Sequence, residues 1–196
     1  MYEPLPPVVE WLKNLRISDL DEIVTDDREI YELAGQYAAE AVKEKLRLYE
    51  DELLPLCKLY SLETQLSRAL NKKVWLKSGG YLVIEQTEAL TAVDVNSGKM
   101  VKKKDSFLKT NLEAAEELVR QIGLRNLSGM IIVDFINLQE KSEEEQLIRA
   151  LKNYIQQENT GIVYVDMTRL GLVELTRKKN GKTLRELFVD GRKEEV

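Results

Sequence analysis

An aspartate and an asparagine, Asp94 and Asn96, stand where the sequence could support chemistry on a phosphate or a hard cation. They belong to the run Thr91 to Gly98, which alternates as a strand does and stops at the turn signal Asn-Ser-Gly. Side chains at i and i+2 of a strand share a face, so Asp94 and Asn96 are expected side by side at the mouth of an apolar strand. The same residues are also ordinary turn chemistry, so both readings are open at this point.

Asp134 supplies a second carboxylate in an equivalent place. It is the one charge in the apolar run 130–136, a pattern typical of a central strand buried on both faces. One predicted helix separates it from Asp94. If the two strands are neighbours, both carboxylates emerge at the same edge of the sheet, where open α/β sheets commonly place their ligands.

Such a pair fits Mg²⁺, which binds oxygen and is typically held by one or two carboxylates together with phosphate oxygens of a substrate. The prediction is therefore a Mg²⁺ site with Asp94 and Asp134 as ligands. Asn96 would orient a carboxylate or hold the scissile phosphate without adding negative charge. The competing interpretation is that both aspartates cap turns after their strands, since Asp166 has a similar strand-end position and such a pattern arises easily.

The elements that must position these residues are predicted as an α/β layer with helices packed on a mixed sheet. The strands at 81–85 and 89–96 are joined by so short a link that an antiparallel hairpin is expected. Thr110 and Glu113 fit a capping box at the start of the next helix. The other expected elements are helices at 27–45 (with Asp26 or Asp27 as N-cap), 62–70, 142–157 and 183–188, strands at 46–49, 130–136 and 161–167, and a strand or helix at 171–176.

Composition narrows the chemistry. The chain has 196 residues, 43% apolar and 32% charged, which is normal for a globular protein with a sizeable core. It contains one cysteine, Cys57, and no histidine, so a zinc site of the usual kind is excluded and any metal must be held by oxygen. No run approaches the roughly 20 apolar residues of a membrane span, and the first residues lack a signal-peptide pattern. A cytoplasmic location is expected.

The net charge of −5 is unevenly distributed, because two basic clusters flank the candidate site. Such runs are usually solvated surfaces, but a polyanion bound near Asp94 would need something like them. The residues expected to contact backbone phosphates are Lys102, Lys103, Lys104, Arg177, Lys178 and Lys179.

Several segments together resemble the catalytic domain of the ribonuclease E/G family, in the family's order and spacing over about a hundred residues. They are Gly79-Gly80-Tyr81-Leu82-Val83-Ile84-Glu85, Thr87-Glu88-Ala89-Leu90-Thr91, Asp94-Val95-Asn96-Ser97-Gly98, Thr110-Asn111-Leu112-Glu113-Ala114-Ala115, Asp134-Phe135-Ile136 and Gly171-Leu172-Val173-Glu174-Leu175-Thr176-Arg177-Lys178-Lys179.

The resemblance implies a function and a fold. It makes Asp94 and Asp134 the aspartates that hold the catalytic Mg²⁺, with Asn96 beside them. The implied reaction is hydrolysis of single-stranded RNA to 5′-phosphate and 3′-hydroxyl ends, in RNA processing and decay. The implied domains are an RNase H-like portion at 1–70, a DNase I-like catalytic subdomain at 71–190 and a charged tail at 191–196. Asp166 matches no site of the family.

Departures from the family pattern limit what is carried over. The S1 RNA-binding domain and the 5′-phosphate sensor that precede this region in full-length members are missing, and no cysteine pair follows the Thr-Arg-Lys stretch. A homo-oligomer is possible, but a zinc-linked one is not supported. Asn137 stands where a second acid often follows Asp-Phe-Ile. We interpret the chain as a catalytic core, either expressed by itself or naturally shortened.

Two alternatives follow. The first is a catalytically weak or inactive RNA-binding or docking module of the same fold, favoured by the expected absence of an aromatic stacking platform or second binding domain to hold RNA. The second is a metal phosphodiesterase acting on DNA or small phosphoesters, because two aspartates and an asparagine do not by themselves distinguish RNA from DNA.

Overall fold

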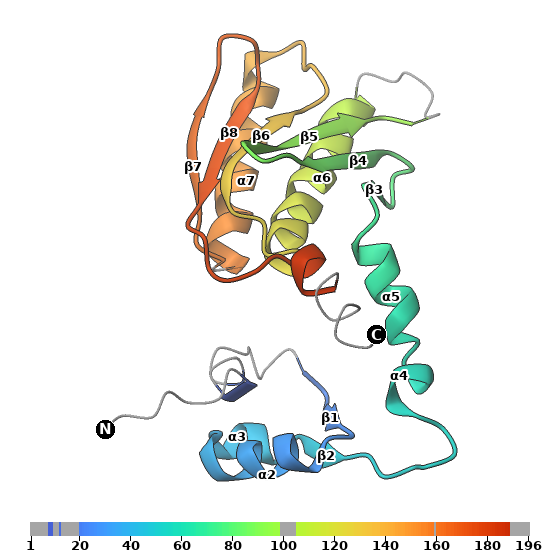
Figure 1. The fold of residues 1–196 in the computed structure, drawn as a ribbon. Helices are drawn as coiled ribbons and strands as arrows, with labels where there is room; N and C mark the ends of the chain where they lie inside the picture. Colours follow the sequence, from blue (N-terminus) through green and yellow to red (C-terminus); the bar gives the residue numbers. More distant parts are fainter. Residues whose placement is uncertain (1–7, 10–11, 13–19, 99–104, 159, 189–196) are drawn as a thin grey trace. The chain divides into compact units, whose positions relative to one another are not determined.

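The computed structural model describes residues 8–9, 12, 20–98, 105–158 and 160–188 (Figure 1). The chain divides into two compact units, Met1–Leu66 (unit 1) and Ser67–Val196 (unit 2). The boundary expected after residue 70 lies near this division, and the assignment of the units to RNase H-like and DNase I-like subdomains stays a prediction. No helix in the described part of the chain is both long and apolar enough to cross a membrane.

Unit 1 is built on a short parallel strand pair with helices between and after the strands. Its elements are β1 (Ile23–Thr25), α2 (Arg28–Tyr37), α3 (Glu40–Lys43), β2 (Leu46–Leu48) and α4 (Leu56–Leu59), and α5 (Leu62–Ala69) continues into unit 2. Asp27 caps α2 as predicted, accepting a hydrogen bond from the Ile30 backbone N–H at 3.1 Å. The single helix predicted over 27–45 is wrong, because the backbone is extended at Ala38 and Ala39 and separates α2 from α3.

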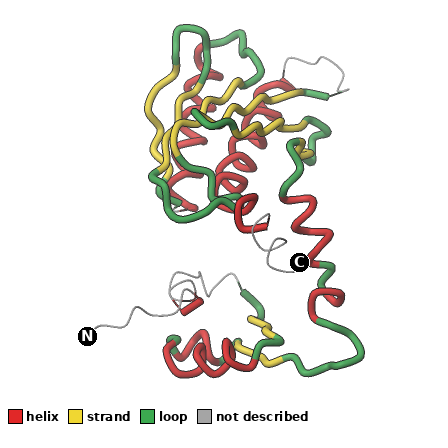
Figure 2. The backbone as a smooth tube through the Cα atoms, in the orientation of Figure 1, coloured by secondary structure: helices red, strands yellow, loops and turns green. Residues whose placement is uncertain are grey.

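Unit 2 contains the α/β layer that the sequence predicts. Its elements are β3 (Lys73–Trp75), β4 (Tyr81–Gln86), β5 (Leu90–Asn96), α6 (Asp105–Leu124), β6 (Gly129–Asp134), α7 (Lys141–Glu158), β7 (Ile162–Met167) and β8 (Val173–Arg177). In the described residues the strands form a six-stranded mixed sheet in the order β3-β4-β5-β6-β8-β7. The colouring by secondary structure in Figure 2 shows both long helices packed against this sheet. The α/β fold class is confirmed.

One face of the sheet is buried under α6 and α7, and the other is open. Alternate strand residues point at the helices and form the core, and these are Leu82, Ile84, Val93, Val95, Ile131, Val133, Val173 and Leu175. The residues between them face the other way, and Met130 on β6 is 54% exposed. Burial of β6 on both faces, which its apolar run predicts, is therefore wrong: in the described residues the helices cover only one face.

Strands β5 and β6 are parallel neighbours, joined by α6 as a crossover. A parallel pair needs a long connection, and the twenty-residue helix α6 supplies it. Strands β4 and β5 form the predicted antiparallel hairpin. As a result β5 and β6 end at the same edge of the sheet.

The capping box expected at Thr110 and Glu113 is wrong, because α6 begins five residues earlier at Asp105 and Thr110 lies inside it. A capping box instead opens the helical turn at 184–188. There the Glu186 backbone N–H donates to Thr183 Oγ1 at 3.2 Å, and the Thr183 N–H donates to the Glu186 carboxylate at 2.6 Å.

Candidate active site

Asp94 and Asp134 lie side by side at the open edge of the sheet. They are Cα partners in the parallel β5–β6 ladder, and they form its last pair. Both are exposed, on the face that the helices leave open. Neighbouring strands are about 4.8 Å apart, so the two carboxylates stand close enough to share one cation. The neighbour relation that the metal prediction requires is therefore present.

Asn96 extends this pair along β5. Two residues beyond Asp94 and on the same face, it donates a hydrogen bond from Nδ2 to Asp94 Oδ2 at 2.5 Å. The contact fixes one oxygen of the Asp94 carboxylate and leaves the other available. Asn96 also brings no charge of its own, which suits a site that receives a phosphate.

Helix α6 holds the segment that follows Asp134. Asn111 is completely buried; its Nδ2 donates to the Ile136 carbonyl at 2.8 Å, and its Oδ1 accepts from the Ile136 N–H at 3.0 Å. These two bonds replace the ladder bonds that end with β6, so the backbone just beyond Asp134 has a fixed path. The sequence analysis does not predict that Asn111 binds the backbone after Asp134. The only signal for it is an asparagine on the apolar face of the helix.

The same helix holds the turn next to Asn96. The Glu113 carboxylate accepts hydrogen bonds from the Lys77 N–H and from the Ser78 N–H, the latter at 3.0 Å. This explains why Glu113 does not cap its own helix. These hydrogen bonds hold the turn between β3 and β4 against α6, beside the candidate site.

Two glycines allow this turn to approach β5 closely. A Cβ on Gly80 would lie 2.7 Å from the Asn96 carbonyl oxygen and 2.9 Å from Thr110 Cγ2. A Cβ on Gly98, whose φ is +66°, would lie 2.4 Å from the Gly79 carbonyl oxygen. Glycine is therefore required at both positions by backbone contact.

The donor set fits Mg²⁺. Among the described residues no group of three histidine, cysteine, aspartate or glutamate side chains is placed to hold a metal ion. Two adjacent exposed carboxylates are nevertheless a usual protein contribution to a Mg²⁺ site, since water and substrate phosphate complete the coordination. Asp94 and Asp134 are the residues that would hold the ion.

Asp166, the strand-end acid considered as a counterexample, lies elsewhere. On β7 it pairs with Glu174 of β8, so the whole of β8 separates it from β6. Its Oδ1 accepts a hydrogen bond from the Met167 N–H at 2.8 Å. The Asp166 side chain is thus bonded to the backbone of the residue that follows it. Burial, together with the charge of Asp166, raises the pKa of Tyr164.

Of the predicted basic contacts, the described ones, Arg177, Lys178 and Lys179, are not gathered at the carboxylates. Lys102, Lys103 and Lys104 lie outside the described residues. Arg177 pairs with Gly129, at the end of β6 opposite to Asp134.

Arg177 also has structural partners at that end. It donates to the Thr160 carbonyl at 2.6 Å, to Asn126 Oδ1 at 2.7 Å and to the Leu127 carbonyl at 2.9 Å, and burial lowers its pKa. Lys178 and Lys179 follow it and are exposed. Phosphate binding by these residues stays a prediction.

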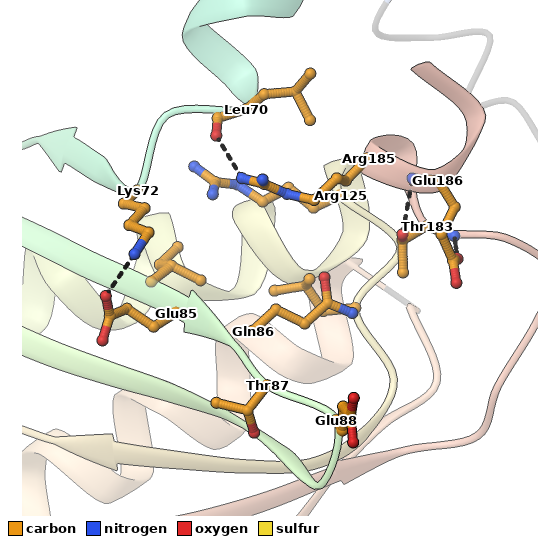
Figure 3. Close-up of a pocket in the computed structure, with 12 residues that line it drawn as sticks. Leu70, Lys72, Glu85, Gln86, Thr87, Glu88, Arg125, Thr183, Arg185 and Glu186 are labelled. Carbon is orange, nitrogen blue, oxygen red and sulfur yellow. Dashed lines mark hydrogen bonds and ion pairs between the residues drawn. The ribbon is translucent and has the colours of Figure 1, made fainter. Parts of the chain in front are cut away.

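A separate cavity of about 430 Å³ lies at the other end of the β4–β5 hairpin, lined by residues that include Gln86, Thr87, Arg125 and Arg185. Figure 3 shows the two arginine side chains close together in it. Arg125 donates to the Asn71 carbonyl at 2.8 Å, and burial, together with the neighbouring Arg185 charge, lowers its pKa. Because β5 begins here and ends at Asp94, this cavity is distinct from the carboxylate site.

The amino-acid sequence of the chain is similar to sequences of known proteins. Residues 1–180 match the model of the Ribonuclease E/G family. The chain is 36% identical to Ribonuclease G of Salmonella typhimurium over 194 residues, covering 96% of this chain and 40% of that protein. It is 34% identical to Ribonuclease E of Escherichia coli over 186 residues, covering 91% of this chain and 17% of that protein. The chain thus spans well under half the length of these relatives.

Proposed function

Because the chain belongs to the ribonuclease E/G family, we propose that its unit 2 is the catalytic core of a Mg²⁺-dependent endoribonuclease. The substrate is single-stranded RNA, and the products carry 5′-phosphate and 3′-hydroxyl ends, as in RNA processing and decay. The observation that carries the proposal is the pairing of Asp94 with Asp134 on neighbouring parallel strands. Relatives named ribonuclease G and ribonuclease E support the choice of RNA.

Each residue of the site has a task in this reaction. Asp94 and Asp134 bind the ion, and Asn96 orients Asp94 through its 2.5 Å hydrogen bond while presenting no charge that would repel the phosphate. When bound, Mg²⁺ supplies Lewis-acid stabilisation of the phosphate and a lowered pKa for the attacking water. Hydrolysis breaks the bond between phosphorus and the 3′-oxygen, which accounts for the two product ends.

The open face of the sheet suits a polymeric substrate. Asp94 and Asp134 are exposed, and none of the residues that the structure describes encloses them in a cavity, so a strand of RNA can pass across them with both ends free. Cleavage within a chain requires such access. The exposed edge therefore agrees with an endonuclease better than with an enzyme that acts on a small phosphoester.

The test is cleavage of an end-labelled single-stranded RNA across a Mg²⁺ titration. Asp94→Asn and Asp134→Asn should each fold, as judged by circular dichroism. Each should lower the rate of RNA cleavage by more than about a hundredfold, which is the upper end of the loss typical of groups that only support a metal ligand. Asp166→Asn is the matched control, because it removes a strand-end carboxylate outside the pair, and it should cleave normally.

Three results would count against the proposal. Undiminished cleavage by both pair variants would remove the mechanism. RNA binding without cleavage at saturating Mg²⁺ would favour the binding or docking module. Equal cleavage of a matched DNA oligonucleotide would favour a general phosphodiesterase.

A further inference from the structure

Two aromatic side chains meet on the open face of the sheet, and we call them the aromatic pair. The rings of Trp75 on β3 and Tyr81 on β4 are 5.2 Å apart between centroids and inclined at 61°. Lys73 Nζ lies 4.1 Å from the Trp75 ring centroid and 3.5 Å from that of Tyr81. The turn at 76–80 brings the two rings together across the β3–β4 ladder, whereas the sequence predicts no aromatic stacking platform.

The aromatic pair is in register with the carboxylate site. Trp75 is the cross-strand partner of Tyr81, and Tyr81 is the partner of Asn96. Directly opposed residues share a face of the sheet, so Trp75, Tyr81 and Asn96 form one row. At about 4.8 Å per strand, Trp75 lies on the order of 10 Å from Asn96.

Lys73 belongs to the adjacent row. Through Val83 it is aligned with Asp94 and Asp134. The row thus begins with a cation at the sheet edge and ends with the two carboxylates. Both rows cross the same open face.

Core packing does not account for Trp75. It is 64% exposed, whereas its neighbour Val74 faces the other way and packs against the core. Lys73 makes no ion pair with any described residue. The nearby acid Glu85 is already paired with Lys72, whose Nζ is 2.8 Å from its carboxylate. An exposed indole and an unneutralised ammonium therefore lie together.

We propose that Trp75, Tyr81 and Lys73 form a stacking site for one nucleobase of single-stranded RNA, close to the bond that is cleaved. This inference rests on the proposed function and assigns it a substrate-binding element. Aromatic stacking accepts any base, because every base has a π-face. Lys73 would bind the phosphate of the stacked nucleotide as a point charge. The site would hold RNA in register without reading its sequence.

The first test uses the fluorescence of Trp75. The chain has two tryptophans, so Trp11→Phe makes Trp75 the sole reporter, and Asp134→Asn prevents cleavage. A single-stranded RNA oligonucleotide should quench this fluorescence saturably. An oligomer of the same length made only of abasic ribose phosphates should not. Trp75→Ala should weaken RNA binding about tenfold, and Trp75→Phe should restore most of it.

The second test locates the base. One abasic nucleotide is moved along a labelled RNA with a single cleavage site, in Mg²⁺. Cleavage by the unsubstituted chain should fall about tenfold at one confined set of positions. Trp75→Ala should cleave slowly whatever the abasic position. Val163→Ala is the control, since it trims an exposed residue on the opposite edge strand, and it should keep the position dependence.

The two hypotheses fail in different ways. Unchanged Trp75 fluorescence on adding RNA, or a position dependence that persists in Trp75→Ala, would overturn the stacking site. Quenching by RNA together with no cleavage by the unsubstituted chain would support the stacking site and overturn the proposed function.

Discussion

At the scale of single residues, the site depends on one neutral side chain beside two charged ones. Asn96 fixes one oxygen of Asp94 by hydrogen bonding, and Asp134 meets Asp94 from the neighbouring strand. A carboxylate at position 96 would add negative charge where a phosphate must approach. The identity of Asn96, and not only its polarity, is therefore part of the account.

Asn96→Asp tests this point. Repulsion of the substrate phosphate and loss of the Nδ2 donor should together lower the cleavage rate about 10- to 100-fold, the range typical of groups that support a metal ligand. Initial rates at saturating Mg²⁺ measure the effect. Asn153→Asp, which adds the same charge at an exposed position on α7, should leave the rate unchanged. Equal rates for the two variants would show that the charge at position 96 does not matter.

At the scale of secondary structure, α6 places both halves of the site. Its Asn111 binds the backbone beyond Asp134, and its Glu113 binds the turn that packs against Asn96. The helix is also the crossover that makes β5 and β6 parallel. One element thus sets strand direction, strand order and the path of the backbone at both strand ends.

Gly80→Ala should disturb the site through the backbone. The added methyl would stand 2.7 Å from the Asn96 carbonyl oxygen, so β5 must shift, at a cost of about 1–3 kcal/mol in the free energy of unfolding. Urea denaturation measures the stability, and RNA cleavage should fall with it.

Gly35→Ala is the matched control for this prediction. Gly35 lies within α2 with open space around it, so the same change should raise stability by about 0.5–1 kcal/mol. A Gly80→Ala protein as stable and active as the unsubstituted chain would contradict the packing described for the turn.

At the scale of the whole molecule, the sequence predicts the α/β layer and the co-facial Asp94 and Asn96, because the alternation of the strand is a local signal. The order of strands in a sheet depends on residues far apart in the chain. The sequence therefore predicts the pairing of Asp94 with Asp134 only on the condition that their strands are neighbours. The sequence does not indicate the partners of Glu113, because the Lys77 and Ser78 N–H groups lie about 35 residues away. Trp75 and Tyr81 are only six residues apart, but their meeting depends on the antiparallel β3–β4 pair, and the sequence analysis predicts no strand at 73–75.

If Asp134 and Asp94 hold the ion that cleavage requires, exchanging one ligand atom should change which ion supports cleavage. Asp134→Cys in a Cys57→Ser background replaces a hard oxygen ligand by a thiolate, which favours softer ions than Mg²⁺. Asp166→Cys in the same background is the control.

We expect Asp134→Cys to lose RNA cleavage in Mg²⁺ and to regain it in Cd²⁺ or Zn²⁺, while Asp166→Cys behaves as the background protein does with every ion. Full cleavage by Asp134→Cys in Mg²⁺ would contradict the assignment of Asp134 as a metal ligand.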